Sequence, residues 1–549
     1  MTMRRLTFAL LILCLPAAAQ TETPERVGVS GQRREISLAG AIEAALRSNL
    51  EIEVEKLNIE RTTATERGAR GFLDPSIHWS PRFEDRATPT SSPLLGREGR
   101  LEETVLTQNA SFTQRLPWRG ISFSAFFDNT RQTTTNPFNS LSPFVLSRLG
   151  ANFAIPLLRD GETDRLRANL RVTRKQVELS KAAFELKVID VVRRVEEAYW
   201  NLVAARQSVE VSSEAVILAR EQLARTKRMI DSGTLAPVEL AAAEAELERR
   251  LDTWYSAIGV VTQTENQLKQ LLAGGRDDGL WHDELLPSEQ RTLEPPAVSG
   301  VREAVDTALR NRPELSQVDL QMETNGIQQQ LARNQTRPQA NVIGGVVMTG
   351  LAGSITASEN PFGASTQLQV GRLNQLSEIA GLPPLPEISF GGVPAGLVGG
   401  YGTALEGIFK GSYPTAYIGM EFDLTLRNRA AKAELSRAAI AERQLRFQRS
   451  QLEQAIEAQV RNALQEVQTA RQRIAAAQAS VRAAQEKLDS EIRLFQTGES
   501  TNFLVLTRQN ELSDSRRRAV VARLDFNKAV SHVNQALGAT LRTYNIELE

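Results

Sequence analysis

The chain has 549 residues, with 65 basic and 65 acidic side chains, a hydrophobic fraction of 41% and a single cysteine. The balanced charge excludes a global field that would attract nucleic acid or an anionic membrane surface, and one cysteine excludes a disulfide framework within the chain. The three histidines, His78, His282 and His532, lie in unrelated segments without the spacing of a metal site or of a nucleophile and its base. The composition therefore argues against an enzyme.

The first 19 residues have the pattern of a secretory signal peptide. Arg4 and Arg5 precede the apolar run 6–15, and small residues follow Pro16. Cys14 lies in this run, so we expect it to be removed with the signal peptide at 1–19. Residues 20–36 are expected to form a flexible N-terminus. No later stretch has the roughly 18 to 20 apolar residues of a membrane-spanning helix, so insertion into a membrane would have to use strands.

The rest of the sequence contains an internal repeat. The stretch AIEAALRSNLEI at 41–52 returns as AVDTALRNRPEL at 304–315. A glycine also recurs at a corresponding position of each half, at Gly233 and at Gly498. Such self-similarity predicts two copies of one architecture rather than several unrelated domains. We expect a first structural repeat at 37–272, an equatorial linker at 273–298, a second structural repeat at 299–538 and a C-terminal tail at 539–549.

Both repeats predict the same elements in chain order. The first predicts a helix at about 37–70, strands within 72–157, a very long helix at about 162–231, a tip near 233 and a helix at about 237–272. The second predicts helix 299–334, strands within 339–424, helix 428–496, a tip near 498 and helix 502–537. The two longest blocks contain no proline and are rich in helix-forming residues.

A helix of about 69 residues is on the order of 100 Å long and must pack against other helices as a coiled coil. We expect the shorter helices to match that length by stacking end to end, for example 237–272 followed by 299–334.

The strand blocks alternate apolar and polar residues. In 77–83 the odd positions are apolar or aromatic apart from Pro81, and 415–423 alternates in the same way. Nine of the 19 phenylalanines fall between 72 and 156, a concentration typical of the aromatic girdles of an outer-membrane barrel. For any single segment, a strand of a soluble sandwich with one wet face explains the pattern equally well.

The number of strands matters, because about four to six per chain are too few to close a membrane barrel, for which about eight is the minimum. Several chains must then share one barrel, since open edges are not tolerated in lipid. Extra strands near 105–129 leave the count open, and these strands could extend beyond the membrane as a hairpin. The long loop at 350–412 is expected to be an extracellular loop or plug with a short helix at about 367–379.

Over nearly the whole mature sequence, the chain resembles the TolC-type outer-membrane efflux proteins. The resemblance rests on the two repeated helix openings, on the junctions Asp74-Pro75 and Arg337-Pro338, and on the stretch 155–161. Most specific are the turns GTLAPVEL at 233–240 and GESTNFLV at 498–505. The resemblance implies an α+β membrane protein: a homotrimer whose shared transmembrane β-barrel of twelve strands continues into a long α-helical coiled-coil periplasmic tunnel, in the outer membrane of a Gram-negative-type bacterium.

The implied function is the outer membrane channel of a tripartite efflux or type I secretion system. It is a passive exit duct, without a cofactor, for substrates handed over by an inner-membrane pump and a periplasmic adaptor (membrane fusion protein). The alternative is a periplasmic coiled-coil scaffold or adaptor without a channel, but adaptors carry one helical hairpin rather than two hairpins separated by strand blocks. The sequence does not identify the cargo.

The resemblance also assigns residues. The adaptor-docking tips correspond to Gly233, Thr234, Leu235, Gly498, Glu499 and Ser500. A gating role is implied for Glu239, although Ser500 stands where its basic partner is expected, so how the tips stay closed is open. Each glycine is equally explained as a helix C-cap that needs positive φ, and Glu239 as a solvated carboxylate on the helix flank.

Overall fold

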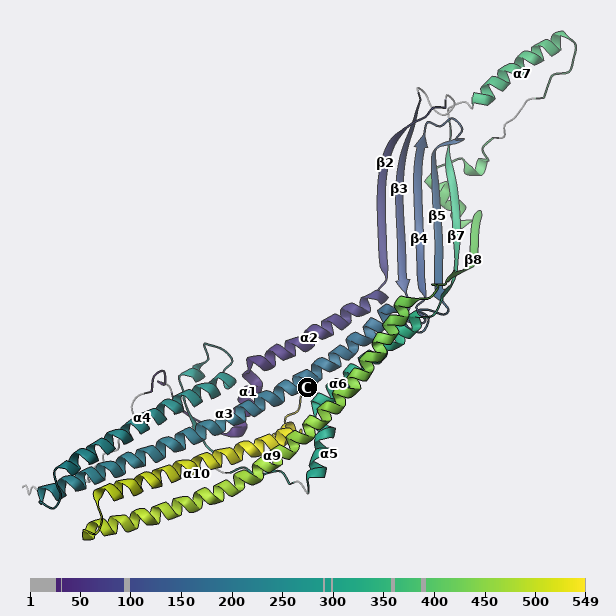
Figure 1. The fold of residues 1–549 in the computed structure, drawn as a ribbon. Helices are drawn as coiled ribbons and strands as arrows, with labels where there is room; N and C mark the ends of the chain where they lie inside the picture. The colour runs from purple at the N-terminus through teal and green to yellow at the C-terminus, as the bar shows by residue number, and fades with distance from the viewer. Residues whose placement is uncertain are drawn as a thin grey trace, which may run out of the picture. The chain divides into compact units, whose positions relative to one another are not determined.

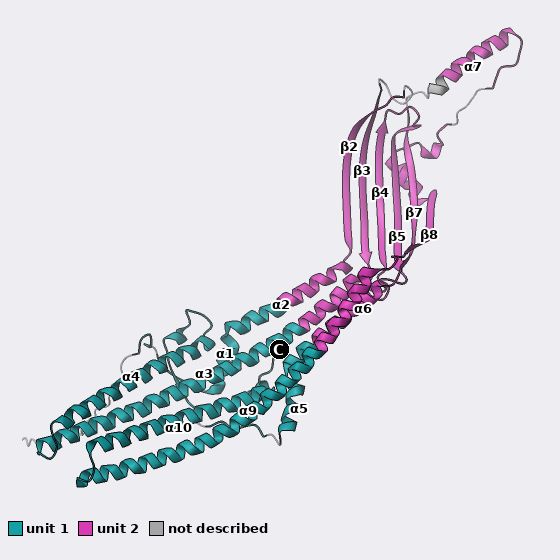
Figure 2. Ribbon diagram, viewed as in Figure 1, with its two compact units in different colours: residues 1–60, 179–319, 447–549 teal, residues 61–178, 320–446 magenta. Residues whose placement is uncertain are grey.

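The computed structural model describes residues 26–30, 32–92, 99–289, 292–297, 300–356, 361–386 and 392–548. The expected signal peptide, with Cys14, lies outside these residues. The chain divides into two compact units, each assembled from separate stretches of the sequence (Figure 2). Unit 1 consists of 1–60, 179–319 and 447–549, and unit 2 of 61–178 and 320–446. None of the helices in the described part of the chain combines the length and apolarity needed to cross a membrane.

The elements follow the predicted order (Figure 1). Those of the first half are β1 (Arg33–Ile36), α1 (Leu38–Ser48), α2 (Leu50–Arg70), η1 (Gly71–Leu73), β2 (Ser76–Pro89), β3 (Arg100–Arg115), β4 (Ser122–Thr134), β5 (Leu141–Pro156), α3 (Arg165–Asp231) and α4 (Val238–Leu272). After η2 (Gly279–Trp281) come β6 (Glu284–Pro287), α5 (Val301–Asn311), α6 (Pro313–Gln335), β7 (Gln339–Ile355), α7 (Pro361–Ile379), η3 (Ala395–Leu397), α8 (Tyr401–Phe409), β8 (Tyr413–Asp423), α9 (Arg429–Thr497), α10 (Asn502–Ala536) and α11 (Thr540–Thr543). The two longest helices, of 67 and 69 residues, begin and end within a few residues of their predicted bounds.

Each half opens with two helices where the sequence predicts one. Asn49 adopts an extended conformation between α1 and α2, and its side-chain oxygen accepts a hydrogen bond from the backbone N–H of Glu51 at 2.9 Å. Arg312 is extended between α5 and α6, because a residue that precedes proline disfavours the helical conformation. The predictions of continuous helices at 37–70 and 299–334 are therefore wrong at one residue each.

The core of unit 1 surrounds the middle of α3. Val195, Tyr199 and Leu202 of α3 are fully buried together with Leu268 of α4. β1 and β6 form a parallel two-stranded sheet beside them. The Tyr199 hydroxyl donates to the carbonyl oxygen of Ile36 at 3.3 Å, at the end of β1. The expected linker at 273–298 thus contributes a strand to unit 1 as well as loops.

The shorter helices of unit 1 abut within each half of the sequence. The Asn49 side chain, at the end of α1, donates to the carbonyl oxygen of Leu271 in α4 at 3.0 Å. The Arg312 guanidinium, at the end of α5, donates to the carbonyl oxygen of Ala536 in α10 at 3.2 Å. The predicted stacking of 237–272 onto 299–334 is wrong, because α4 meets α1 and α5 meets α10. The linker is long enough to carry the chain from one helix pair to the other.

Unit 2 contains a six-stranded sheet in the order β2-β3-β4-β5-β7-β8, in which all neighbouring strands are antiparallel (Figure 1). The extra strands expected near 105–129 are β3 and β4. They pair along their lengths with β2 on one side and β5 on the other. β3 and β4 therefore belong to the sheet itself and do not stand apart from it as a hairpin of two strands.

The sheet has one apolar and one polar face, because directly opposite residues of neighbouring strands point to the same side. One row across the sheet reads Ile77, Phe112, Ala125, Ala151, Val346 and Ala416. The adjacent row, on the other face, reads Ser76, Thr113, Ser124, Asn152, Gly345 and Tyr417. In these two rows the alternation predicted from sequence thus continues across all six strands. Two rows farther along the apolar face, the register gives the more polar row Pro81, Gln108, Asn129, Ser147 and Gly350.

The long segment between β7 and β8 contains two helices. α7 covers the predicted short helix at 367–379 and begins earlier. α8 packs against β7 so closely that a Cβ on Gly350 would lie 1.8 Å from the carbonyl oxygen of Ala404. Ala404 is buried against Val145 and Ala352, which point to the apolar face of the sheet. This part of the segment therefore does not plug the polar face.

Candidate functional site: the two helical turns

Each turn that the sequence predicts as a docking tip contains a glycine in the left-handed conformation. The φ angle is +74° at Gly233 and +81° at Gly498. In the first turn the backbone N–H of Thr234 donates to the carbonyl oxygen of Met229 at 2.9 Å, and in the second that of Glu499 donates to Leu494 at 2.9 Å. Both glycines therefore serve as C-caps of α3 and α9, for which glycine is preferred because it tolerates positive φ.

An apolar cluster in unit 1 joins the two turns. Phe495 and Leu488 of α9 and Val505 of α10 are buried in it, and Phe495 is only 4% exposed. Met229 and Leu235, which flank the first turn, pack against this cluster. The first hairpin, formed by α3 and α4, is thus held against the second hairpin, formed by α9 and α10, by side chains next to both tips.

A polar bridge also crosses between the hairpins. The Gln222 amide of α3 donates to the side-chain oxygen of Asn502 at 2.7 Å, and the Asn502 amide donates to Glu239 of α4 at 3.2 Å. Gln222 and Asn502 are 3% and 2% exposed, so the bond between them lies in the packed interface. A hydrogen bond that is protected from water is costly to break without replacement. We call Gln222, Asn502 and Glu239 the tip bridge.

The tip bridge shows where the predicted gating residue lies. Glu239 faces the second hairpin, where its contact is Asn502 rather than a group at position 500. The Ser500 hydroxyl instead donates to Glu491 within its own hairpin. Sequence reasoning missed Gln222 and Asn502, because an uncharged amide on a long helix gives no signal of a buried partner. The only local hint is that Asn502 follows the N-cap residue Thr501.

A second polar connection lies farther along the hairpins. Arg250 of α4 is 6% exposed, and its guanidinium contacts both Glu246 at 2.8 Å and the side chain of Asn510 on α10. Burial lowers the pKa of Arg250, while the neighbouring Glu246 carboxylate favours its charged form. Arg516 of α10 pairs with Glu214 of α3 in the same interface. The two hairpins therefore contact through polar groups at several levels.

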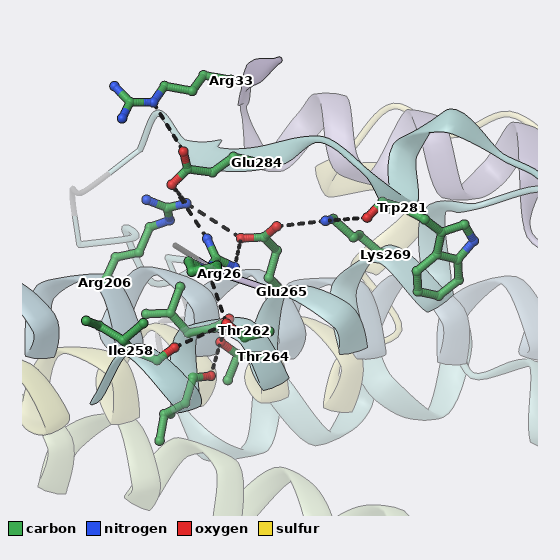
Figure 3. Close-up of polar contacts among 12 residues, drawn as sticks. Arg26, Arg33, Arg206, Ile258, Thr262, Thr264, Glu265, Lys269, Trp281 and Glu284 are labelled. Atoms are coloured by element: carbon green, nitrogen blue, oxygen red, sulfur yellow. Dashed lines mark hydrogen bonds and ion pairs between the residues drawn. The ribbon is translucent and has the colours of Figure 1, made fainter. Parts of the chain in front are cut away.

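A separate polar cluster of unit 1 has a structural role. Glu265 and Lys269 of α4 form an ion pair at 2.8 Å in which both side chains are fully buried (Figure 3). Arg26 pairs with Glu265 at 2.7 Å, and Lys269 also donates to the carbonyl oxygen of Trp281 at 3.1 Å. Glu284 of β6 accepts from Arg206 at 3.0 Å. The cluster ties the N-terminal segment and β6 to α4, and its two carboxylates, Glu265 and Glu284, are shared among these three basic side chains.

Within the described ranges, no group of three or more histidine, cysteine, aspartate or glutamate side chains could hold a metal ion. His532 lies on α10 between Glu466 of α9, at 3.1 Å, and Glu197 of α3, at 3.3 Å. It therefore links three helices.

Comparison with known proteins finds a family match over part of the chain and a shared fold over most of it. The outer membrane efflux protein family matches residues 117–274, and a search of curated proteins returns no match. Three solved structures share the fold. The outer-membrane channel CmeC of Campylobacter jejuni has 16% identity and a TM-score of 0.60, with 92% of this chain and 86% of that chain covered. The outer-membrane channel MtrE of Neisseria gonorrhoeae, in its open state, has 16% identity and a TM-score of 0.59, with 92% and 89% covered. CusC, described in connection with transmembrane channel formation, has 15% identity and a TM-score of 0.61, with 91% of each chain covered. The family match over residues 117–274 and the shared fold confirm the resemblance to TolC-type outer-membrane efflux proteins.

Proposed function

We propose that this chain forms the outer membrane channel of a tripartite efflux or type I secretion system. It would act as a passive exit duct for substrates delivered by an inner-membrane pump through a periplasmic adaptor. The family match over residues 117–274 carries the proposal, and the fold shared with CmeC and MtrE supports it. The sheet of unit 2 suits this role, because a barrel wall needs one face for lipid and one for water.

The channel would be a homotrimer in the outer membrane, with the helical part in the periplasm. The sheet of one chain has two open edges, and unpaired backbone groups are not tolerated in lipid. Several copies must therefore share one barrel, and the resemblance to TolC-type proteins favours three. The similar order of elements in the two halves is consistent with an internal duplication, to which the domain limits at 37–272 and 299–538 correspond.

The helical turns would form the gate. Opening requires the first hairpin to move away from the second, which would break the tip bridge and separate Leu235 from the cluster around Phe495. An adaptor that binds the tips at Gly233, Thr234, Leu235, Gly498, Glu499 and Ser500 would favour opening only if it bound the open arrangement more tightly. Glu239 would act in closure through Asn502.

The first experiment is to determine the cell fraction and the native mass of the mature protein extracted in mild detergent, followed by conductance in planar bilayers. A trimer from the outer-membrane fraction that conducts ions supports the channel. A periplasmic monomer without conductance would refute it and favour the alternative, a coiled-coil scaffold or adaptor without a channel.

A further inference from the structure

We propose that each copy contributes six strands to the shared barrel, so that a trimer has eighteen barrel strands instead of the twelve that the resemblance implies. This inference rests on the proposed channel function, because it requires that copies share one barrel. Its structural basis is the position of β3 and β4, which lie between β2 and β5 in one continuous sheet.

Both additional strands are long enough to cross a membrane. β3 has 16 residues and β4 has 13, whereas a tilted transmembrane strand needs about 9 to 11 residues. β3 is paired with β2 from Ser76 opposite Thr113 to Pro89 opposite Arg100, and β4 is paired with β5 from Ser122 opposite Ala154 to Gln132 opposite Phe144. A projecting hairpin would have to give up both of these ladders.

The side chains of β3 and β4 also continue the two faces of the sheet. Phe112 and Ala125 lie in the apolar row that contains Ala151 of β5. Thr113 and Ser124 lie in the adjacent polar row that contains Asn152. In these rows β3 and β4 keep the alternation that a strand between lipid and an aqueous lumen requires. Gln108 of β3 and Asn129 of β4, two rows away on the same face, interrupt the apolar surface.

The open edges of the sheet suit a second copy of this chain. β2 and β8 are exposed along nearly their whole length, although they carry the large apolar residues Trp79 and Phe422. With an even number of strands, β2 and β8 run in opposite directions, so β2 of one copy and β8 of the next would pair antiparallel, as all neighbours within the sheet do.

The strand number determines the width of the barrel. Strands about 4.8 Å apart and tilted by about 40° give a diameter of about 36 Å for eighteen strands and about 24 Å for twelve. The cross-section would therefore be about twice as large, and barrels of 16 to 18 strands leave an aqueous channel. We infer that the barrel of this protein is wider than the resemblance implies.

Single cysteines in the two adjacent rows test the proposal in the full-length protein, since the only natural cysteine, Cys14, lies in the expected signal peptide. The apolar-row variants are Phe112→Cys, Ala125→Cys and Ala151→Cys, and the polar-row variants are Thr113→Cys, Ser124→Cys and Asn152→Cys. The protein is reconstituted in phosphatidylcholine vesicles after its native mass has given the number of copies. The rate of reaction with a water-soluble maleimide is then measured. A thiol that faces lipid should react at least about tenfold more slowly than a thiol that faces water, because the reactive thiolate is disfavoured in lipid.

The β5 pair, Ala151→Cys and Asn152→Cys, is the internal control. Slow apolar-row and fast polar-row reaction on β3, β4 and β5 alike, in a protein of three copies, supports eighteen strands. Alternation on β5 with fast reaction at all four β3 and β4 positions overturns the strand count but leaves the channel function intact. Loss of alternation on β5 as well would overturn the channel proposal itself. If Phe112→Cys fails to fold, Ala125→Cys and Ser124→Cys decide the same question.

Discussion

Replacement of Asn502 by alanine should loosen the contact between the two helical hairpins. The change removes the partner of Gln222 at 2.7 Å and the amide that donates to Glu239 at 3.2 Å. Asn502 is the first residue of α10, and alanine is the best helix former, so the helix itself should not suffer. The effect should therefore be confined to the interface.

The expected loss of free energy at the contact between the hairpins follows from the burial of the groups that lose a partner. A buried polar group that loses its partner costs about 1–3 kcal/mol, and this applies to Gln222, which is 3% exposed. Glu239 is only half-buried, so water would replace most of its lost bond, which adds a smaller amount. A total of about 2–3 kcal/mol corresponds to a shift of roughly 30- to 160-fold in the equilibrium between docked and separated hairpins.

The assay is single-channel conductance of the purified protein in planar bilayers without an adaptor. If the tips form the gate, Asn502→Ala should increase the open probability by an amount of this order. Ser500→Ala is a matched control two residues away, because Ser500 bonds only to Glu491 of its own hairpin in the described structure and should leave the open probability unchanged. Equal behaviour of Asn502→Ala, Ser500→Ala and the unmodified protein would refute the closure role of the tip bridge. A double-mutant cycle with Gln222→Ala should show that the two effects are not additive.

Three further predictions concern stability, measured as the melting temperature of the detergent-extracted protein. Glu197 and Glu466 raise the pKa of His532 above its ordinary value of 6.5, so the stabilisation is complete below about pH 6.5 and is lost as the pH rises through the raised value. His532→Gln should therefore be less stable than the unmodified protein at pH 6 by up to about 1 kcal/mol, and the difference should vanish at high pH; a constant difference would contradict the assignment. Gly350→Ala should cost about 1–3 kcal/mol by forcing α8 off the sheet, whereas Gly402→Ala, which has no described atom within 4 Å of the added methyl group, should cost nothing. Lys269→Met should cost about 1–3 kcal/mol, less than the cost of a buried charge without any partner, because Glu265 keeps Arg26 at 2.7 Å. Glu265→Gln should cost more, because it removes the carboxylate that both Lys269 and Arg26 contact; a smaller loss for Glu265→Gln would contradict this reasoning.

The long helices, the two turns and the alternating strands could be predicted from the sequence, because each depends on local rules. Helix needs the absence of proline over a long stretch, as in α3 and α9. A turn between helices needs a residue that tolerates positive φ, which Gly233 and Gly498 provide. The break at Asn49 was missed, because asparagine inside an amphipathic pattern does not reveal whether its side chain caps the next helix or faces solvent.

Tertiary structure alone decided the partners. Three contacts depend on which segments lie side by side, often more than 200 residues apart in the sequence. Glu239 reaches Asn502, α4 meets α1, and β3 and β4 lie in the middle of the sheet. The sequence by itself determined the periodicity of each segment and so which face it buries, because that follows from the helix and strand repeats. It did not determine what covers that face, because an apolar row or a buried amide accepts any partner of suitable shape and polarity, and only the folded chain selects one.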